Sequence, residues 1–229
     1  VTDVERPREI DADTLFQAGS VTKTLTATLL VQLVDEGRLD LDAPVRRYLP
    51  ALTLADRRVS AEVTCRQLLA HLAGFEGDHF RDTGGGHDAL ARYVDVLREA
   101  PQLVPFDAWH SYSNAGYSLL GHVVEVLRDR PFEEVARRHV LEPLGLGASR
   151  FADREPPGPF ASGHVLQAGV ARPVRPWTHF RSTAPAGGLV SSARELLRYA
   201  RFHLRGAPGV LAAPSLERMR LPLYAPEKS

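Results

Sequence analysis

A serine and a lysine three positions apart are the residues best suited to chemistry. Ser20 and Lys23 form a Ser-x-x-Lys pattern, and residues at this spacing share one face of a helix, so an amine can lie beside a hydroxyl. A serine hydroxyl becomes an effective nucleophile when a neighbouring base takes its proton, which a deprotonated amine can do and an arginine cannot. Apart from Lys228, every other Lys or Arg position holds arginine. The pair therefore predicts a nucleophile beside its general base.

A tyrosine and an asparagine form the second pattern, Tyr112-Ser113-Asn114, which contains the only asparagine of the chain. A phenol near a lysine can pass protons, and an amide side chain can orient a substrate carbonyl or the lysine. Each pattern also has a purely structural interpretation. Ser20 and Asn114 can cap helices while Tyr112 packs against its neighbours, so the patterns need support from their surroundings.

Two predicted helices carry these patterns at their first turns. The first helix runs from Ser20 to Glu36, and Gly37 follows where a left-handed C-terminal cap is favoured. The second helix runs from Asn114 to about Leu127. In the first helix the apolar residues recur at steps of three and four, at Leu25, Leu29, Leu30, Leu33 and Val34.

Weaker signals mark the rest of the chain. Residues 1–6 alternate apolar and polar side chains and predict a strand whose partner would lie before the first residue. Residues 150–188 are rich in proline and glycine and predict a long ordered loop with a short hairpin. Ser192 and Glu195 have capping-box spacing and begin a further helix, and Ser215 is expected to cap a last short one.

The composition indicates one globular domain and excludes several partners. The chain has 229 residues, of which 44% are hydrophobic and 24% are charged. Lys plus Arg and Asp plus Glu each number 28, so there is no net basic field for nucleic acid or an anionic membrane surface. No apolar run approaches the ~18 residues that a membrane span needs. A single cysteine, Cys65, excludes an internal disulfide and a multi-cysteine zinc site and leaves the cellular compartment open.

Five segments in a fixed order extend the two patterns over nearly the whole chain. They are Phe16–Lys23, Leu68–Phe75, Tyr112–Gly121, Pro143–Leu146 and Pro185–Glu195. Together they closely resemble the serine β-lactamase-like family, which takes in class C β-lactamases, D-Ala-D-Ala carboxypeptidases, D-aminopeptidases and related esterases. Such an ordered set is far more specific than either short pattern alone.

The resemblance implies a helix-rich α+β chain with the β-lactamase/transpeptidase-like fold. A partial α/β region would comprise residues 1–50 and 180–229, and a mostly helical insertion would comprise residues 51–179, the two together forming one domain. Most of the antiparallel sheet of the family is expected to lie outside this chain. The strand predicted at residues 1–6 further predicts a second chain that completes the sheet.

The resemblance also implies a role for each residue of the two patterns. Ser20 would be the acylated nucleophile, and Lys23 would be its base partner. Tyr112 would complete proton transfer, and Asn114 would orient the substrate through its amide. No metal and no organic cofactor is implied. His71, which has several leucines beside it in the sequence, is interpreted as a structural histidine.

Two departures from the family pattern bear on activity. The third motif of the family, Lys-Thr-Gly or His-x-Gly on a late strand, is not found in residues 1–229. That strand supplies one N–H of the oxyanion hole, and the loss of one such donor typically costs about 10²- to 10³-fold in rate. In addition, Gly187 stands where class C β-lactamases place an aromatic residue over the pocket.

We therefore predict a serine hydrolase or acyl-transferase that forms an acyl-enzyme on a small ester, amide or β-lactam substrate. An esterase, a D-amino-acid peptidase and a β-lactam hydrolase stay open, and Gly187 favours the first two. The alternative from a different class is a catalytically incomplete fragment or pseudoenzyme that acts as a binding or interaction module.

Overall fold

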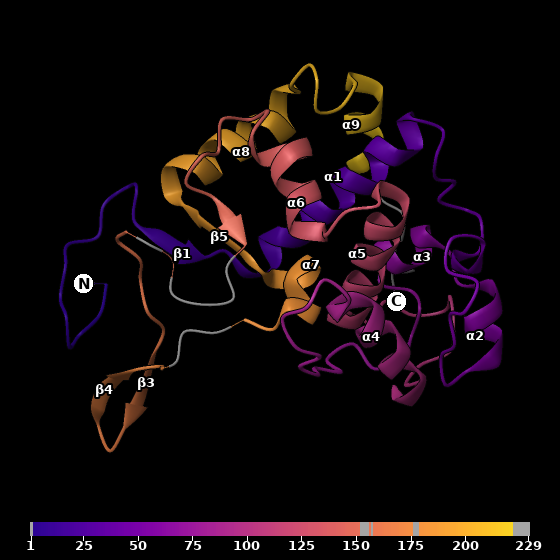
Figure 1. Ribbon diagram of the computed structural model, residues 1–229, viewed down its shortest axis with the longest axis horizontal. Coiled ribbons are helices and arrows are strands. Elements are labelled where there is room, and N and C mark those ends of the chain that lie inside the picture. The colour runs from indigo at the N-terminus through magenta and orange to yellow at the C-terminus, as the bar shows by residue number, and fades with distance from the viewer. Residues whose placement is uncertain (1, 152–155, 157, 176–178, 222–229) are drawn as a thin grey trace, which may run out of the picture.

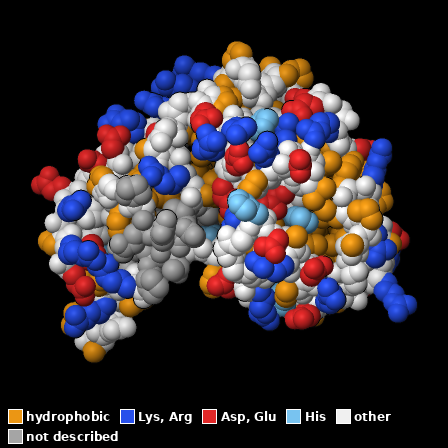
Figure 2. All heavy atoms as spheres, viewed as in Figure 1, with side chains coloured by type: hydrophobic (Ala, Val, Ile, Leu, Met, Phe, Trp, Pro, Cys, Tyr) orange, Lys and Arg blue, Asp and Glu red, His pale blue; other side chains and the backbone are white. Residues whose placement is uncertain are grey.

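The architecture is a helical body with a small antiparallel sheet on one side (Figure 1). The computed structural model describes residues 2–151, 156, 158–175 and 179–221. On the face drawn in Figure 2, acidic and basic side chains are interspersed, as the balanced composition predicts. Within the described residues, no helix combines the length and the apolar character that crossing a membrane requires.

Three long helices, all of which match predicted segments, dominate the body. The first begins two residues later than predicted, because residues Gly19–Val21 form a 3₁₀ turn before it. The long helices are α1 (Thr22–Asp35), α5 (Asn114–Arg128) and α8 (Ala193–Arg205). The short helices are α2 (Arg57–Glu62), α3 (Cys65–Leu69), α4 (Ala89–Val96), α6 (Phe132–Ala136), α7 (Ala184–Gly187) and α9 (Ala213–Met219).

Helix α1 is the central helix of the body, and α5, α6, α7 and α9 pack against it. Its fully buried leucines are Leu25, Leu29, Leu30 and Leu33. Burying a leucine side chain stabilises a fold by about 1.5–3 kcal/mol, so these residues contribute strongly to the core. The hydroxyl of Thr26 is buried as well and donates to the Pro185 carbonyl oxygen of α7 at 2.7 Å. Helix α1 is therefore held by apolar packing and by a polar contact to α7.

The main sheet has the strand order β1–β5–β2, and both pairings are antiparallel. Its strands are β1 (Leu15–Gln17), β2 (Arg150–Phe151) and β5 (Leu189–Ser192). The central strand β5 is buried along its whole length, with Ser191 opposite Phe16 and Val190 opposite Arg150. A separate hairpin, made of β3 (His164–Gln167) and β4 (Val170–Pro173), projects from the body (Figure 1). This hairpin confirms the one predicted within residues 150–188.

The predicted strand at the start of the chain is wrong: residue 1 lies outside the described residues, residues 2 and 3 belong to no strand, and residues 4–6 form a bend. The Asp3 carboxylate accepts the N–H groups of Glu5 at 2.8 Å and Arg6 at 3.4 Å, which curls the backbone. A short acidic side chain that bonds its own following backbone competes with extended pairing. The alternating pattern therefore does not produce a strand here, and the unpaired strand that suggested a second chain is absent from residues 2–6.

One buried core joins the two predicted regions of the chain. Leu29 and Leu189 from the predicted α/β region and Leu119 from the predicted helical region belong to the same cluster. The division into residues 1–50 with 180–229 and residues 51–179 stays a prediction, and its last eight positions, 222–229, lie outside the described residues. The expectations that most of the antiparallel sheet lies outside this chain and that a second chain completes it also stay predictions.

Of the two predicted helix caps, one is confirmed and one is wrong. Ser192 caps α8 by accepting the Glu195 N–H at 3.3 Å. Ser215 lies inside α9 instead of before it, and its hydroxyl donates to Asp35 Oδ1 at 2.6 Å. The Ser215 hydroxyl therefore ties α9 to the end of α1 instead of capping a helix.

Helix α7 is wedged between α1 and α5. A methyl group at Gly121 of α5 would come within 2.1 Å of Pro185 Cγ, so only glycine fits at this crossing. Ala186 follows Pro185, and its carbonyl oxygen accepts from Lys23. The crossing therefore sets the distance between α7 and Lys23.

Gly121→Ala is expected to lower the free energy of unfolding by about 1–3 kcal/mol, because the added methyl pushes α7 away from α5. Urea unfolding followed by circular dichroism measures the change. Gly147→Ala is the matched control, since a methyl there meets no atom within 4 Å. Equal stability of the Gly121→Ala and wild-type chains would contradict the packing argument.

Candidate active site

Ser20 lies in a tight turn that β5 holds from both sides. Gly19, in the 3₁₀ turn before α1, has a φ of 53°, a left-handed conformation that favours glycine. The Ala18 N–H donates to the Leu189 carbonyl oxygen at 2.8 Å, and the Leu189 N–H donates to Thr22 Oγ1 at 3.0 Å. The serine is therefore fixed against the buried central strand.

Lys23 is buried, and three oxygen atoms surround its amine. Its Nζ lies 3.3 Å from Ser20 Oγ, 2.6 Å from Asn114 Oδ1 and 2.8 Å from the Ala186 carbonyl oxygen. The residue is only 5% exposed. The Tyr112 ring covers it, with its centroid 4.8 Å from Nζ. The two residues of the Ser-x-x-Lys pattern are thus brought together, with the amine of Lys23 buried and Ser20 exposed to solvent.

Tyr112 and Asn114 join the same cluster from the start of α5. Tyr112 Oη donates to Ser20 Oγ at 2.8 Å. Ser113, not Asn114, caps the helix, because its Oγ accepts the Gly116 N–H at 2.8 Å. The Asn114 amide is therefore available to accept from Lys23. The structure places all the residues of the two patterns, Ser20, Lys23, Tyr112 and Asn114, in one connected group.

Two of the oxygen atoms around Lys23 determine where the lone pair of its amine can point. A neutral amine has two N–H donors and one lone pair, whereas an ammonium has three donors. When the two N–H groups are donated to Asn114 Oδ1 and the Ala186 carbonyl oxygen, the lone pair faces Ser20 Oγ. The arrangement can therefore move one proton between Ser20 and Lys23 while both side chains stay in place.

Asp78 is a residue of the cluster that the sequence analysis missed. Its Oδ1 accepts from Asn114 Nδ2 at 2.6 Å. Because a carboxylate only accepts, Asn114 turns its NH₂ towards Asp78 and its oxygen towards Lys23. The preceding Gly77 allows the close approach, since a Cβ there would lie 2.2 Å from the Tyr112 carbonyl oxygen. The pair Gly77-Asp78 has no defined spacing to either pattern, so the sequence carries no signal for this role.

Asp78→Asn is expected to slow acylation of Ser20 about tenfold, because an amide can donate as well as accept and no longer fixes the orientation of Asn114. The rate of adduct formation with a fluorophosphonate, followed by intact mass, measures the effect. Asp82→Asn is the control, since the Asp82 Oδ1 accepts from Gly84 within the same loop. An unchanged rate in Asp78→Asn would show that Asn114 needs no such partner.

His71 lies beside the cluster and stays uncharged at neutral pH. Burial, together with nearby His110 and Lys23, lowers the pKa of His71 to about 4. Its Nδ1 accepts the Ser113 N–H at 3.0 Å. This hydrogen bond requires the neutral ring, so the structural interpretation of His71 agrees with its contacts.

The lowered pKa of His71 predicts a loss of stability in mild acid. A histidine in the unfolded chain titrates near 6.5, so between about pH 6.5 and 4 the unfolded chain binds a proton that the folded chain does not. The contribution to stability is complete above about pH 6.5 and is lost as the pH falls towards 4. Burial also lowers the pKa values of His139, His179 and His203, which add to the same slope.

Urea unfolding at pH 7.5 and pH 4.5 tests this prediction. The wild-type chain is expected to be less stable at the lower pH, and His71→Asn is expected to show a smaller difference between the two. The same difference in both chains would mean that His71 does not contribute to the acid sensitivity.

The cluster opens onto a groove of about 800 Å³ that runs along α1. Ser20, Lys23 and Tyr112 line one end of this groove, and apolar side chains such as Val31 and Val34 line its length. A ligand that reaches Ser20 can therefore place an apolar part along α1.

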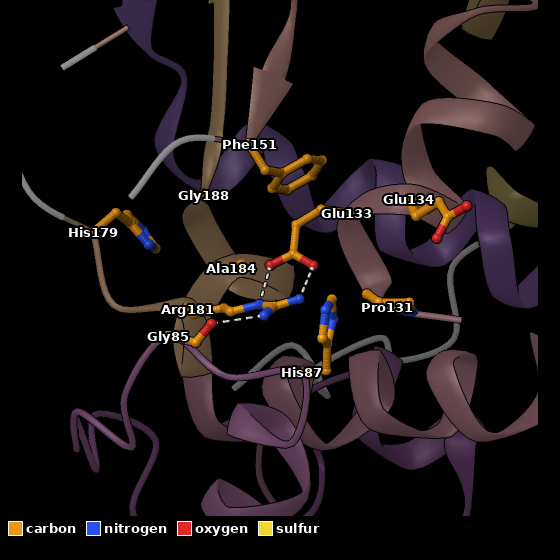
Figure 3. A pocket seen from close by; sticks show the side chains of 10 residues that line it. All are labelled: Gly85, His87, Pro131, Glu133, Glu134, Phe151, His179, Arg181, Ala184 and Gly188. Carbon is orange, nitrogen blue, oxygen red and sulfur yellow. Dashed lines mark hydrogen bonds and ion pairs between the residues drawn. The ribbon is translucent and has the colours of Figure 1, made fainter. Parts of the chain in front are cut away.

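A second pocket, of about 330 Å³, lies beside α7 and includes Ala184 and Gly188 in its lining (Figure 3). The Arg181 guanidinium crosses it and donates to both carboxylate oxygens of Glu133, and to the Gly85 carbonyl oxygen. The charges of Arg181 and Glu133 therefore compensate each other. Ser20 is not among the residues that line this pocket. Ser20 therefore belongs to the groove along α1.

The helical body, the small antiparallel sheet and the Ser-Lys-Tyr-Asn cluster at two helix starts together define the β-lactamase/transpeptidase-like class. The chain belongs to the β-lactamase family, whose model matches residues 1–228. The predicted helix-rich β-lactamase/transpeptidase-like fold is therefore confirmed. Its homologues are named as penicillin-binding proteins, D-amino acid amidases, esterases and class C β-lactamases.

Three relatives illustrate the similarity. "Penicillin-binding protein 4" of Amycolatopsis lactamdurans is 39% identical over 219 residues, which are 92% of this chain and 58% of that protein. The structure of SurE matches with a TM-score of 0.81 and 33% identity, over 99% of this chain and 51% of SurE. A D-stereospecific amidohydrolase from a Streptomyces species matches with a TM-score of 0.76 and 29% identity, over 93% of this chain and 67% of that structure. The chain thus spans only about half to two thirds of the length of these relatives.

Proposed function

We propose that the chain carries the acylating centre of a serine hydrolase or acyl-transferase. The proposal rests on the environment of Lys23. Its buried amine lies within hydrogen-bond distance of Ser20 Oγ, and two carbonyl oxygens, from Asn114 and Ala186, accept its other hydrogen bonds. The homologues named as amidases and esterases support this reading. Ser20 is the nucleophile, Lys23 is the base, Tyr112 carries the proton onwards and Asn114 orients Lys23 and the substrate.

Acylation moves one proton around a closed path. Ser20 Oγ attacks the carbonyl carbon of an ester, amide or β-lactam and forms a new O–C bond, and its proton passes to Lys23 Nζ. When the tetrahedral intermediate collapses, the bond to the leaving oxygen or nitrogen breaks. Tyr112 Oη protonates that leaving atom and is reprotonated from Lys23. Water or another acceptor then attacks the acyl-enzyme by the reverse path and restores the Ser20 hydroxyl.

The space beside Gly187 favours esters and amides over β-lactams as substrates. A Cβ at this position would lie 3.5 Å from His179 Nε2 and 3.9 Å from the Gly19 carbonyl carbon, in the turn that holds Ser20. Class C β-lactamases resemble this chain but place an aromatic residue there, whereas Gly187 has no side chain to cover the pocket. Relatives named as a D-stereospecific amidohydrolase and an esterase fit this choice of substrate class.

Labelling of Ser20 tests the proposal. A fluorophosphonate, and separately a penicillin, is expected to add one equivalent to the wild-type chain and none to Ser20→Ala. Lys23→Arg is expected to react at least about 10²-fold more slowly, because arginine does not release a proton. Lys228→Arg changes the other lysine of the chain and is the matched control. Intact mass measures both the extent and the rate.

The outcome also separates the competing functions. A faster reaction with the fluorophosphonate indicates an esterase or amidase, and a faster reaction with penicillin indicates recognition of β-lactams. A folded wild-type chain that forms no adduct would contradict the proposal and favour a binding or interaction module.

A further inference from the structure

His71 contacts three consecutive residues that directly precede α5. Its carbonyl oxygen accepts the Ser111 N–H at 2.8 Å, and its Nδ1 accepts the Ser113 N–H at 3.0 Å. Between these two hydrogen bonds, its ring lies on the Tyr112 ring, with centroids 4.5 Å apart and planes tilted by 32°. One residue therefore holds the backbone on both sides of Tyr112 and the aromatic side chain itself.

His71 adopts an uncommon backbone conformation in order to make these contacts. Its φ is 60°, in the left-handed region that costs a non-glycine residue of order 1 kcal/mol or more. The conformation follows directly after α3, where the His71 N–H still donates to the Leu68 carbonyl oxygen at 3.2 Å. Such strain persists only where the surroundings hold it in place.

We propose that His71 is a positioning residue that holds Tyr112 Oη within hydrogen-bond reach of Ser20, mainly through the Nδ1 bond to Ser113, with a smaller contribution from the packing of its ring. This inference deepens the proposed function and rests on the acylation of Ser20. The segment 111–113 lies before the first residue of α5, so its N–H groups have no acceptor within that helix. His71 takes the place of such bonds for Ser111 and Ser113.

The groups that face His71 agree with a role exerted through Tyr112. The His110 ring meets it edge-on at 5.4 Å, and the Tyr117 ring lies at 5.2 Å. Nδ1 is occupied by the Ser113 N–H, so this nitrogen is not available as a base for Ser20. The lowered pKa of His71 supports the neutral ring that this bond requires. A displacement of Tyr112 by about 1 Å is enough to cost on the order of 10²-fold in rate.

Two substitutions separate the hydrogen bond from the ring. His71→Asn keeps an acceptor near the position of Nδ1 and tolerates a left-handed backbone, and it is expected to react with a fluorophosphonate within about threefold of wild type. His71→Phe keeps a ring but removes the acceptor, and it is expected to react about 10- to 100-fold more slowly. The maximal rate should fall while the reagent concentration at half saturation stays unchanged. His87→Phe, on the surface, is the control for the exchange of a histidine for a phenylalanine.

A double-mutant cycle with Tyr112→Phe distinguishes positioning from general stability. If His71 acts through Tyr112, His71→Phe slows the reaction strongly in the wild-type background and has little further effect when Tyr112 is already Phe. A slowing of equal size in both backgrounds, or a wild-type rate in folded His71→Phe, overturns the inference.

Amide hydrogen exchange provides a readout that does not depend on activity. Exchange at the Ser113 amide is expected to be faster in His71→Phe and protected in His71→Asn. A wild-type chain that forms no adduct, together with this exchange pattern, would refute the proposed acylation but leave the contact intact. Unchanged protection of Ser113 in His71→Phe would overturn the positioning role, whatever the activity.

Discussion

The buried amine of Lys23 is the constraint on which the rest of the structure depends. A polar group that is 5% exposed must find oxygen atoms nearby, because burying it without partners would cost several kcal/mol. The partners are Asn114 Oδ1 and the Ala186 carbonyl oxygen, which stand 91 and 163 positions further along the chain. Helices α1, α5 and α7 must therefore meet in one geometry. The tight crossing of Gly121 and Pro185 is one result of that requirement.

A second layer of contacts orients the side chains that reach Lys23 and Ser20. Asp78 sets which end of the Asn114 amide faces the Lys23 amine. Strand β5 is hydrogen-bonded to both sides of the turn that carries Ser20. These supports come from a strand and from a loop that packs directly on the start of α5. Rigid support of this kind keeps reacting groups in place before a substrate arrives, which is the basis of preorganised catalysis.

The sequence predicted those features in which local pattern and chemistry coincide. Ser20 and Lys23 could be found because their spacing and the leucine periodicity of α1 point to the same helix face. Asp78 and the Ala186 carbonyl could not be found, because one lacks a spacing signal and the other is a backbone atom placed only by tertiary packing. The strand predicted at residues 1–6 was wrong since the Asp3 carboxylate bonds its own following backbone.

The wide separation of the Lys23 partners in the chain has a consequence for biosynthesis. The ribosome makes the chain from its N-terminus, so Ser20 leaves the exit tunnel long before Asn114 and Ala186 are synthesised. Until the last of these arrives, Lys23 lacks its carbonyl acceptor and has no fixed direction towards Ser20. In the proposed function, the nascent chain therefore carries Ser20 as an ordinary hydroxyl, and the serine would gain its reactivity only as folding is completed. A growing polypeptide of this design would not be open to acylation at Ser20 before Ala186 has been made.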